Sequence, residues 1–230
     1  MRVVITGANR GLGLALSRVY RDLGADVIAG CRTPSSAADL VATGAEVHAF
    51  DQGSEDSIDA FVAAIGGRSL DVLINNAGID ATAVGVPSAE RSVMELSGEA
   101  FLDVMRVNVV GPMLLTRALI TNLAATSGRV VNISSQVGSM EVAQRIGRDV
   151  SYNSSKAALN MVTIKLAQAF KPVGVAVVAM HPGYLRTDMG GPSADLDPAD
   201  AAARIADTIA TLTLDNSATF IRWDGTVHPW

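Results

Sequence analysis

The sequence predicts a doubly wound α/β fold, in which helices cover both faces of a parallel sheet of about seven strands in three layers. Short β-branched apolar runs alternate with longer helical patterns, as in successive βαβ units. The runs are continuously apolar, as expected of strands that are covered on both faces. The expected strands are Val3–Ile5, Val27–Ala29, Val47–Phe50, Val72–Ile74, Val130–Ile133, Val175–Met180 and Thr219–Ile221.

Size and composition indicate one domain over residues 1–230. With 49% hydrophobic residues the chain can fill a large core, and no repeat or linker interrupts the pattern. The net charge of -5 and the scattered basic residues do not favour nucleic acid as a partner. Cys31 is the single cysteine, and the first apolar run is too short for a signal peptide or a membrane span. We therefore expect a cytoplasmic protein without nucleic-acid or membrane partners.

Three segments fit the alternation poorly: residues 79–98, 136–150 and 184–198. They follow expected strands, and ligands of such folds bind outside the carboxyl ends of the strands. We expect these segments to face the substrate. Large side chains in or next to them could line an apolar pocket, although such residues more often serve ordinary packing. The candidates are Met94, Met140, Tyr184, Met189 and Trp230.

A glycine-rich turn follows the first expected strand and opens the helical pattern of residues 14–23. Glycines let the backbone approach a ligand, and the free N–H groups of a helix N-terminus attract an anion. This order is typical of a pyrophosphate site in a Rossmann-type domain, although the spacing is G-x-x-x-G-x-G and a purely structural turn is the alternative. The candidate cofactor residues here are Gly7, Asn9, Arg10, Gly11, Leu12 and Gly13.

The end of the second expected strand indicates which dinucleotide binds. Folds that prefer NAD place an acidic residue there for the ribose 2′-hydroxyl, but this chain has Cys31 followed by Arg32. A guanidinium matches a 2′-phosphate, which a carboxylate would repel. Arg10 could bind the same phosphate. The pair favours NADP(H) over NAD(H), unless both arginines are ordinary surface charges.

Tyr152 and Lys156 lie four residues apart in the helical pattern of residues 151–170, and therefore on one helix face. A nearby ammonium favours the phenolate, so we expect the pKa of Tyr152 to lie below its ordinary value of ~10. Such a tyrosine can act as an acid or base near neutral pH. Ser134 and Ser135 end the preceding strand; one hydroxyl could bind a substrate oxygen while the other turns the chain.

Together these motifs resemble those of the short-chain dehydrogenases/reductases of single-domain size, over nearly the whole chain. The segment 181–191 and the tail 223–230 are most similar to C-factor-like and Sniffer-like carbonyl reductases. The matching positions, in order, are Thr6–Gly13, Asp51, Asn75–Gly78, Asn108, Ser134–Ser135, Tyr152 with Lys156, and Pro182–Gly183 with Thr187.

The resemblance implies a catalytic role for four residues. Tyr152 would donate the proton in reduction, and Ser135, the second serine of its pair, would steady the substrate oxygen. Lys156 would hold the nicotinamide ribose and lower the tyrosine pKa, and Asn108 would anchor a water of the proton relay. The interval of 17 positions between Ser135 and Tyr152 exceeds what the family commonly shows. A longer loop over the active site, residues 136–149, is therefore expected.

The resemblance also implies cofactor contacts outside the glycine-rich turn. Asp51 and Gln52 would meet the adenine ring, and Thr187 would meet the nicotinamide amide. The remaining implied cofactor residues are Asn76, Ala77 and Gly78 at the adenine ribose and the sheet, Pro182 and Gly183, and Tyr152 with Lys156.

We therefore expect an NADPH-dependent oxidoreductase that reduces a medium-sized aldehyde or ketone to an alcohol, or catalyses the reverse reaction. No metal is expected, because the three histidines are widely spaced in the sequence. Two alternatives stay open: a dinucleotide-binding signalling protein of C-factor type, and an NAD-dependent alcohol dehydrogenase. Relatives commonly pair through two long helices, here about residues 99–124 and 151–170, so a homodimer or homotetramer is expected.

Overall fold

The computed structural model describes residues 1–145 and 149–230. Within them, seven parallel strands form one sheet in the order β3-β2-β1-β4-β5-β6-β7. The strands are β1 (Arg2–Thr6), β2 (Asp26–Cys31), β3 (Glu46–Ala49), β4 (Val72–Asn75), β5 (Arg129–Ile133), β6 (Ala176–His181) and β7 (Phe220–Arg222). Each coincides with an expected strand to within about two residues at either end, so the predicted fold is confirmed.

Helices connect the strands. The α-helices are α1 (Gly11–Asp22), α2 (Ala38–Val41), α3 (Glu55–Ile65), α4 (Gly98–Met105), α5 (Gly111–Ala118), α6 (Ile120–Ala124), α7 (Met140–Ala143), α8 (Val150–Phe170) and α9 (Pro198–Ala210). Short 3-10 turns are η1 (Pro34–Ser36), η2 (Ala81–Val84), η3 (Ser88–Glu90), η5 (Gln136–Gly138), η6 (Lys171–Val173) and η7 (Leu214–Asn216), and η4 (Arg106–Val110) is π-helical. Across the described ranges, no helix combines the length and the apolar character needed to cross a membrane.

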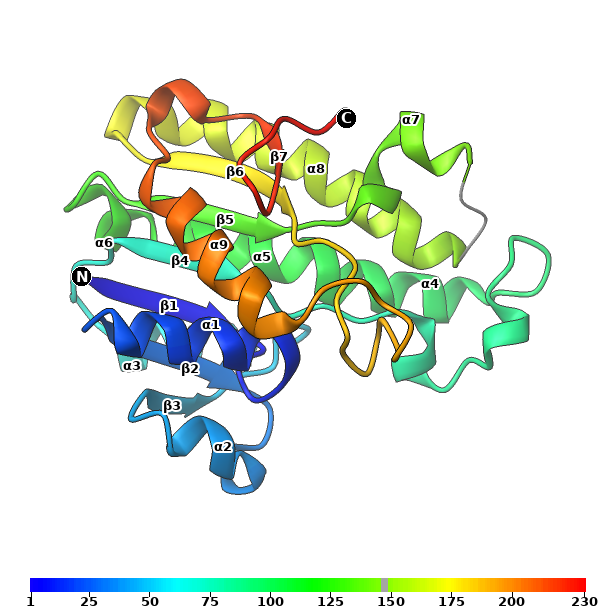
Figure 1. Ribbon diagram of the computed structural model, residues 1–230, viewed down its shortest axis with the longest axis horizontal. Coiled ribbons are helices and arrows are strands. Elements are labelled where there is room, and N and C mark those ends of the chain that lie inside the picture. Colours follow the sequence, from blue (N-terminus) through cyan, green and yellow to red (C-terminus); the bar gives the residue numbers. More distant parts are fainter. Residues whose placement is uncertain (146–148) are drawn as a thin grey trace.

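Two helical layers cover the sheet because successive side chains of a strand point to opposite faces. On one face Val3 and Ile5 pack in a core with residues of α1 and α9. On the other face Val4 packs in a second core with residues of α3, α5 and α8. Figure 1 shows α1 and α9 in front of the sheet, with α5 and α8 behind it. The three-layer arrangement is therefore as predicted.

The long helix expected over residues 99–124 is confirmed with one irregularity and one interruption: α4, η4 and α5 follow one another directly from Gly98 to Ala118, and α6 continues after Leu119. A π-helical turn is rare and often occurs at functional sites, and η4 contains Asn108. At the start of α5, a Cβ on Gly111 would lie 2.2 Å from the carbonyl oxygen of Gln52, so the backbone approaches its neighbour closely there. The second expected long helix is confirmed as α8.

The sheet order creates a crevice at the carboxyl end of β1. This strand lies between β2 and β4, and the chain crosses from β3 at the sheet edge to reach β4. Such a reversal of strand order opens a crevice where ligands bind. The three irregular segments follow β4, β5 and β6. The first holds η2 and η3 and ends at the first residue of α4, and the described part of the second holds η5 and α7 and ends at the first residue of α8. The third, which is described throughout, holds no helix before Pro198, the first residue of α9. Part of the expected loop over the active site, residues 146–148, lies outside the described residues.

Candidate active site

A cleft of about 1090 Å³ lies at the carboxyl ends of the strands. It runs from the glycine-rich turn to the N-terminal part of α8. The sequence-predicted residues in its wall are Gly7, Asn9, Arg10, Gly11, Leu12, Arg32, Asp51, Gln52, Asn76, Ala77, Gly78, Tyr152, Lys156, Pro182, Thr187 and Met189. Four further predicted residues contact or adjoin this wall: Gly13, Asn108, Ser135 and Gly183. Most of the predicted site is therefore brought together in one place.

The glycine-rich turn has the shape of a phosphate cradle. Gly7 and Gly11 have positive φ angles of 64° and 52°, which favour glycine. A Cβ on Gly13 would lie 2.3 Å from the carbonyl oxygen of Gly7, so only glycine fits there. Arg10, the N-cap residue of α1, makes no capping hydrogen bond with its side chain, and no acidic residue lies in the first turn. The free N–H groups at this helix end can therefore donate hydrogen bonds to a bound anion.

Two side-chain amides, of the buried Gln52 and the half-buried Asn76, support this turn. The Gln52 side chain donates to the carbonyl oxygens of Ala77 (2.8 Å) and Val107 (2.9 Å) and accepts from the Thr6 hydroxyl (2.9 Å). The Asn76 side chain donates to the Thr6 carbonyl oxygen (2.9 Å). Because Gln52 also lines the cleft, its expected contact with the adenine ring stays a prediction, although its amide already has hydrogen-bond partners in the fold. Asp51 is exposed in the cleft wall.

Two exposed guanidinium groups border the cleft. Arg32 follows the buried Cys31 directly at the end of β2. Arg10 forms an ion pair with Asp188, which lies in the segment after β6. The sequence did not indicate that partner. The ion pair joins the glycine-rich turn to the opposite wall, where a Cβ on Gly11 would also lie 3.2 Å from Cγ2 of Thr187.

Tyr152 and Lys156 lie on the same side of α8, as predicted. The Lys156 ammonium lies 5.5 Å from the centroid of the Tyr152 ring and donates to the carbonyl oxygen of Ile133 at 2.8 Å. The lysine is only 3% exposed, and burial lowers its pKa to about 8. Gly78 leaves room for it, because a Cβ there would lie 3.3 Å from Nζ. A phenol and an ammonium are therefore adjacent in the wall of the cleft.

The expected fall in the pKa of Tyr152 is wrong. Burial, the largest cause, raises this pKa to about 12; a hydrogen bond with the Ser135 hydroxyl lowers it, and the charges of Asp80 and Asp149 raise it. Burial disfavours the phenolate more strongly than the neighbouring groups favour it. The phenol is consequently held in its protonated form, the form that can donate a proton.

The two serines after β5 have different surroundings. Ser134 lines the cleft but is only 2% exposed, and its hydroxyl donates to Oδ1 of Asn160 at 2.6 Å, so it joins β5 to α8. Ser135 is half-buried, caps η5 through Val137, and has its hydroxyl at the Tyr152 phenol. The geometry therefore supports Ser135 as the serine that faces the reaction.

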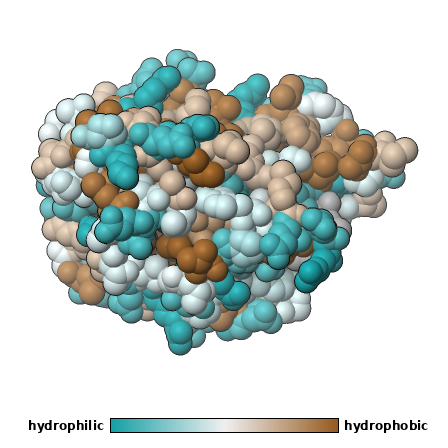
Figure 2. All heavy atoms as spheres, turned by 90° about the horizontal axis from the view of Figure 1, so that it is seen from above, coloured by the Kyte–Doolittle hydropathy of each residue, from teal (hydrophilic) through white to brown (hydrophobic). Residues whose placement is uncertain are grey.

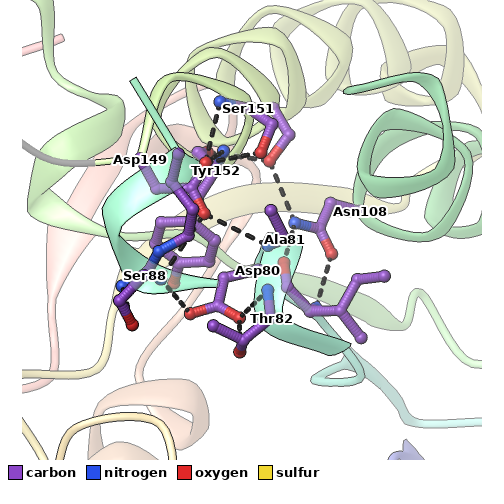
Figure 3. A network of polar contacts seen from close by, with 11 residues as sticks. Asp80, Ala81, Thr82, Ser88, Asn108, Asp149, Ser151 and Tyr152 are labelled. Atoms are coloured by element: carbon purple, nitrogen blue, oxygen red, sulfur yellow. Dashed lines mark hydrogen bonds and ion pairs between the residues drawn. The ribbon is translucent and has the colours of Figure 1, made fainter. Parts of the chain in front are cut away.

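Asn108 is fully buried and joins three parts of the site. Its amide donates to the carbonyl oxygen of Ile79 (2.8 Å) and to the Ser155 hydroxyl (2.9 Å), and it accepts from the Ile79 N–H (2.9 Å). The residue thus fixes the segment after β4 against α8 (Figure 3). The water relay that the resemblance implies for Asn108 stays a prediction.

The expected apolar pocket is not assembled from the five predicted residues. Met189 lines the cleft, but Met94 and Met140 are 89% and 71% exposed and lie outside its wall. Tyr184 is half-buried, and Trp230 stacks on Phe220; neither lines the cleft. Figure 2 shows hydrophobic atoms at the right-hand end of the surface, the end where α7 lies in Figure 1. The apolar residues of the wall include Ile79, Ala83, Val84 and Leu185 instead.

Comparison with known proteins agrees with the fold and the site. The model of the short chain dehydrogenase family matches residues 1–196. The C-signal protein of Myxococcus xanthus is 33% identical over 162 residues, which cover 70% of this chain and 93% of that protein. The 1-hydroxy-2-glutathionyl-2-methyl-3-butene dehydrogenase of Rhodococcus sp. strain AD45 is 31% identical over 239 residues, 99% of both chains.

Solved structures give the same result. The carbonyl reductase Sniffer of D. melanogaster superposes with a TM-score of 0.90 at 30% identity, covering 100% of this chain and 99% of that one. An NADPH-bound carbonyl reductase from chicken fatty liver superposes with a TM-score of 0.89 at 28% identity, covering 100% and 98%. The resemblance drawn from the motifs is confirmed, and the chain belongs to the short-chain dehydrogenase family of oxidoreductases.

Proposed function

We propose that the chain is an NADPH-dependent reductase that transfers a hydride to the carbonyl carbon of an aldehyde or ketone, with Tyr152 as the proton donor. One observation carries the proposal: the hydroxyls of Tyr152 and Ser135 meet beside a buried ammonium, at one end of a cleft whose other end is a glycine-rich helix N-terminus. The similarity to an NADPH-bound carbonyl reductase supports it.

The residues present fit a dinucleotide. The N–H groups at the start of α1 would hold the pyrophosphate, since a Cβ at Gly13 would fill the cradle. Arg32, with Arg10, would hold a 2′-phosphate, which favours NADP(H) over NAD(H). Lys156 would hold the nicotinamide ribose and Thr187 the nicotinamide amide. The bound nicotinamide supplies the hydride.

The protein's own groups serve the carbonyl oxygen. Negative charge develops there as the hydride arrives, and hydrogen-bond donors placed at that point lower the barrier. The Ser135 and Tyr152 hydroxyls would provide these donors, and Tyr152 would then release its proton. A phenol whose pKa is raised to about 12 is protonated at neutral pH, which suits reduction better than oxidation.

Two other functions have some support. The relative named C-signal keeps open a signalling role for a dinucleotide-binding protein without turnover. The relative named as a dehydrogenase keeps open an NAD-dependent alcohol oxidation. Four groups suited to chemistry, at Asn108, Ser135, Tyr152 and Lys156, favour turnover, because a protein that only binds needs no proton donor. The exposed arginines favour NADPH.

The test compares the wild type with Tyr152→Phe on a panel of aldehydes and ketones. We expect the phenylalanine variant to lose about 10²- to 10⁴-fold in kcat and to bind NADPH as tightly as the wild type in a fluorescence titration. Tyr184→Phe, at a half-buried tyrosine outside the cleft wall, is the matched control and should keep its kcat. If the protein binds NADPH but consumes none with any carbonyl compound, the signalling role is favoured. If it binds NADH more tightly than NADPH, NAD-dependent alcohol oxidation is favoured.

Three broader expectations remain proposals. Residues 1–230 would form one domain that acts on a small molecule in the cytoplasm, without nucleic-acid or membrane partners. Copies would pair as a homodimer or homotetramer through α8 and the helices α4 to α6. The exposed apolar side chains Leu102 and Met161, on α4 and α8, support the pairing. Sedimentation equilibrium of the wild type would decide it.

A further inference from the structure

A buried carboxylate caps the helix that carries Tyr152. Asp149 is the N-cap residue of α8, and its Oδ1 accepts hydrogen bonds from the N–H groups of Ser151 (2.9 Å) and Tyr152 (3.0 Å). Its side chain is only 4% exposed. An N-cap carboxylate satisfies helix N–H groups that would otherwise lack a partner. The backbone of Tyr152 is therefore held directly by Asp149 (Figure 3).

The same carboxylate reaches the opposite wall of the cleft. Its Oδ2 accepts from the Ala81 N–H at 3.1 Å and lies 3.6 Å from Nη1 of Arg91. Arg91 also pairs with Asp80 at 2.8 Å, and its carbonyl oxygen accepts from the Val150 N–H at 3.1 Å. A backbone hydrogen bond, a hydrogen bond from a backbone N–H to the Asp149 carboxylate and a partly buried ionic cluster thus join residues 80–91 to the start of α8.

This junction lies next to the catalytic end of the cleft. Ala83 and Val84 belong to the joined segment, Ile79 directly precedes it, and all three line the cleft together with Tyr152. Asn108 makes a second connection, from Ile79 to Ser155 on α8. The connection through Asn108 is uncharged, while the one through Asp149 and Arg91 is ionic. Substitutions of Asp149 or Arg91 therefore leave the fully buried asparagine unchanged.

We propose that Asp149 and Arg91 are positioning residues for the reaction, which hold the Tyr152 phenol at a fixed place against the wall formed by residues 79–84. The proposal rests on the proposed function, because it assigns the pair to the proton-donating step. A small displacement of a reacting group costs a large factor in rate. Neither residue touches the cleft, so the pair acts through Tyr152 and its wall.

Asp149 and Arg91 should also affect the pKa of Tyr152, through the charges around its phenol. The groups that face the phenol are Lys156 on its own helix, Asp149 at the helix cap and Asp80 on the segment after β4. Both carboxylates raise the pKa of Tyr152. Burial by itself would raise the pKa of Asp149. The hydrogen bonds from Ser151, Tyr152 and Ala81 and the charge of Arg91 together lower this pKa below its ordinary value. Asp149 is therefore ionised at neutral pH, and removing its charge should lower the pKa of Tyr152.

The experiment measures kcat, NADPH affinity and the pH profile of reduction for Asp149→Ala, Asp149→Asn, Arg91→Met and Arg91→Lys. We expect Asp149→Ala and Arg91→Met to lose about 10- to 100-fold in kcat with unchanged NADPH affinity. Arg91→Lys, which keeps the charge, should recover most of the rate. In Asp149→Asn, the alkaline fall of the reduction rate that titration of Tyr152 causes, which lies above any fall that Lys156 causes near pH 8, should move to lower pH by about half a unit.

Ser97→Ala is the matched control, because Ser97 caps α4 through the Ala100 N–H (3.2 Å) as Asp149 caps α8. It should lower the melting temperature but leave kcat and the pH profile unchanged. Hydrogen exchange, read without turnover, should increase over residues 80–91 and in the first turn of α8 for Asp149→Ala but not for Ser97→Ala. If Asp149→Ala does not fold, the two Arg91 variants carry the same comparison.

Two outcomes would overturn the proposal and leave the proposed function intact. One is a folded Asp149→Ala or Arg91→Met variant with the kcat of the wild type, even if its hydrogen exchange increases. The other is an unmoved pH profile in Asp149→Asn together with an equal loss of rate in Arg91→Met and Arg91→Lys, which would mean a merely structural role. A wild type that consumes no NADPH with any carbonyl would overturn the proposed function itself.

Discussion

The two ends of the cleft are built from different kinds of group. At the cofactor end, the binding groups are the backbone N–H groups of a helix N-terminus and exposed guanidiniums, and the Arg10 side chain is 66% exposed. At the catalytic end they are buried side chains whose polar atoms already have partners: Lys156 is 3% exposed, and Asn108 is fully buried. One end is open and local in sequence, while the other is enclosed and assembled from distant segments.

The difference follows from what each end must do. A phosphate is a strong anion, which backbone N–H groups and arginines can bind in contact with water. A proton donor works only if it is held in place and shielded, which requires packing from several elements. Substitutions at the cofactor end should therefore change affinity, while substitutions at the catalytic end should change kcat and the pH dependence of stability.

The largest effect should separate the two serines after β5. Ser135→Ala removes the hydroxyl at the Tyr152 phenol and should lower kcat about 10²- to 10³-fold, with little change in the free energy of unfolding. Ser134→Ala leaves the buried Asn160 oxygen without its donor, and should lower the free energy of unfolding by about 1–3 kcal/mol while keeping most of kcat. Steady-state kinetics and urea unfolding measure both. The reverse pattern would assign the catalytic hydroxyl to Ser134.

A second test concerns the stability cost of the buried ammonium. Burial lowers the pKa of Lys156 from 10.5 to about 8, so between pH 8 and pH 10.5 the unfolded chain binds more protons than the folded one. The stability of the wild type should rise with pH across that window and carry a penalty of up to about 3 kcal/mol below it. Lys156→Met removes the penalty, and should therefore be more stable than the wild type at pH 7 although its kcat collapses.

Urea unfolding at pH 7 and pH 10 measures this difference, which should shrink as the pH rises. Lys165→Met, an exposed lysine on the same helix, is the control and should show no such dependence on pH. If Lys156→Met is instead less stable by the same amount at both pH values, the hydrogen bond to the Ile133 carbonyl oxygen outweighs the cost of burial. The buried ammonium would then not destabilise the fold.

At the cofactor end, Gly13→Ala should act on affinity. The new Cβ would lie 2.3 Å from the Gly7 carbonyl oxygen, so the cradle must shift at a cost of about 1–3 kcal/mol, or about 10- to 100-fold in NADPH affinity. At saturating NADPH, kcat should remain close to that of the wild type. Gly67→Ala, where no atom lies within 4 Å of the new Cβ, is the control. A fall in kcat with unchanged affinity would mean that the two ends are not separable.

The sequence predicted what depends on local patterns. The strands were found because apolar runs mark buried parallel strands, and Tyr152 with Lys156 was found because a spacing of four residues places both on one helix face. The glycine-rich turn was found because its glycines are neighbours in the chain. These features need no knowledge of which elements pack against each other.

What the sequence did not predict depends on contacts between distant segments. Asp149 meets the Ala81 N–H across 68 positions, and Gln52 binds Val107 across 55. The pKa of Tyr152 was predicted with the wrong sign because burial, which no motif records, raises this pKa by more than the hydrogen bond with Ser135 lowers it. Met94 and Met140 were assigned to a pocket by their residue type and their place in the irregular segments, yet both are exposed.

The smallest expected effect tests the choice of dinucleotide. Arg32 is exposed beside the cleft, so its contact with a 2′-phosphate is weakened by water and salt. Arg32→Ala should weaken NADPH binding about 10-fold and leave NADH binding unchanged, and the loss should diminish as salt is added. Arg117→Ala, on the exposed side of α5, is the control. Equal losses for both dinucleotides would mean that Arg32 does not read the phosphate. The basis for expecting NADPH would then pass to Arg10, whose ion pair with Asp188 would have to open first.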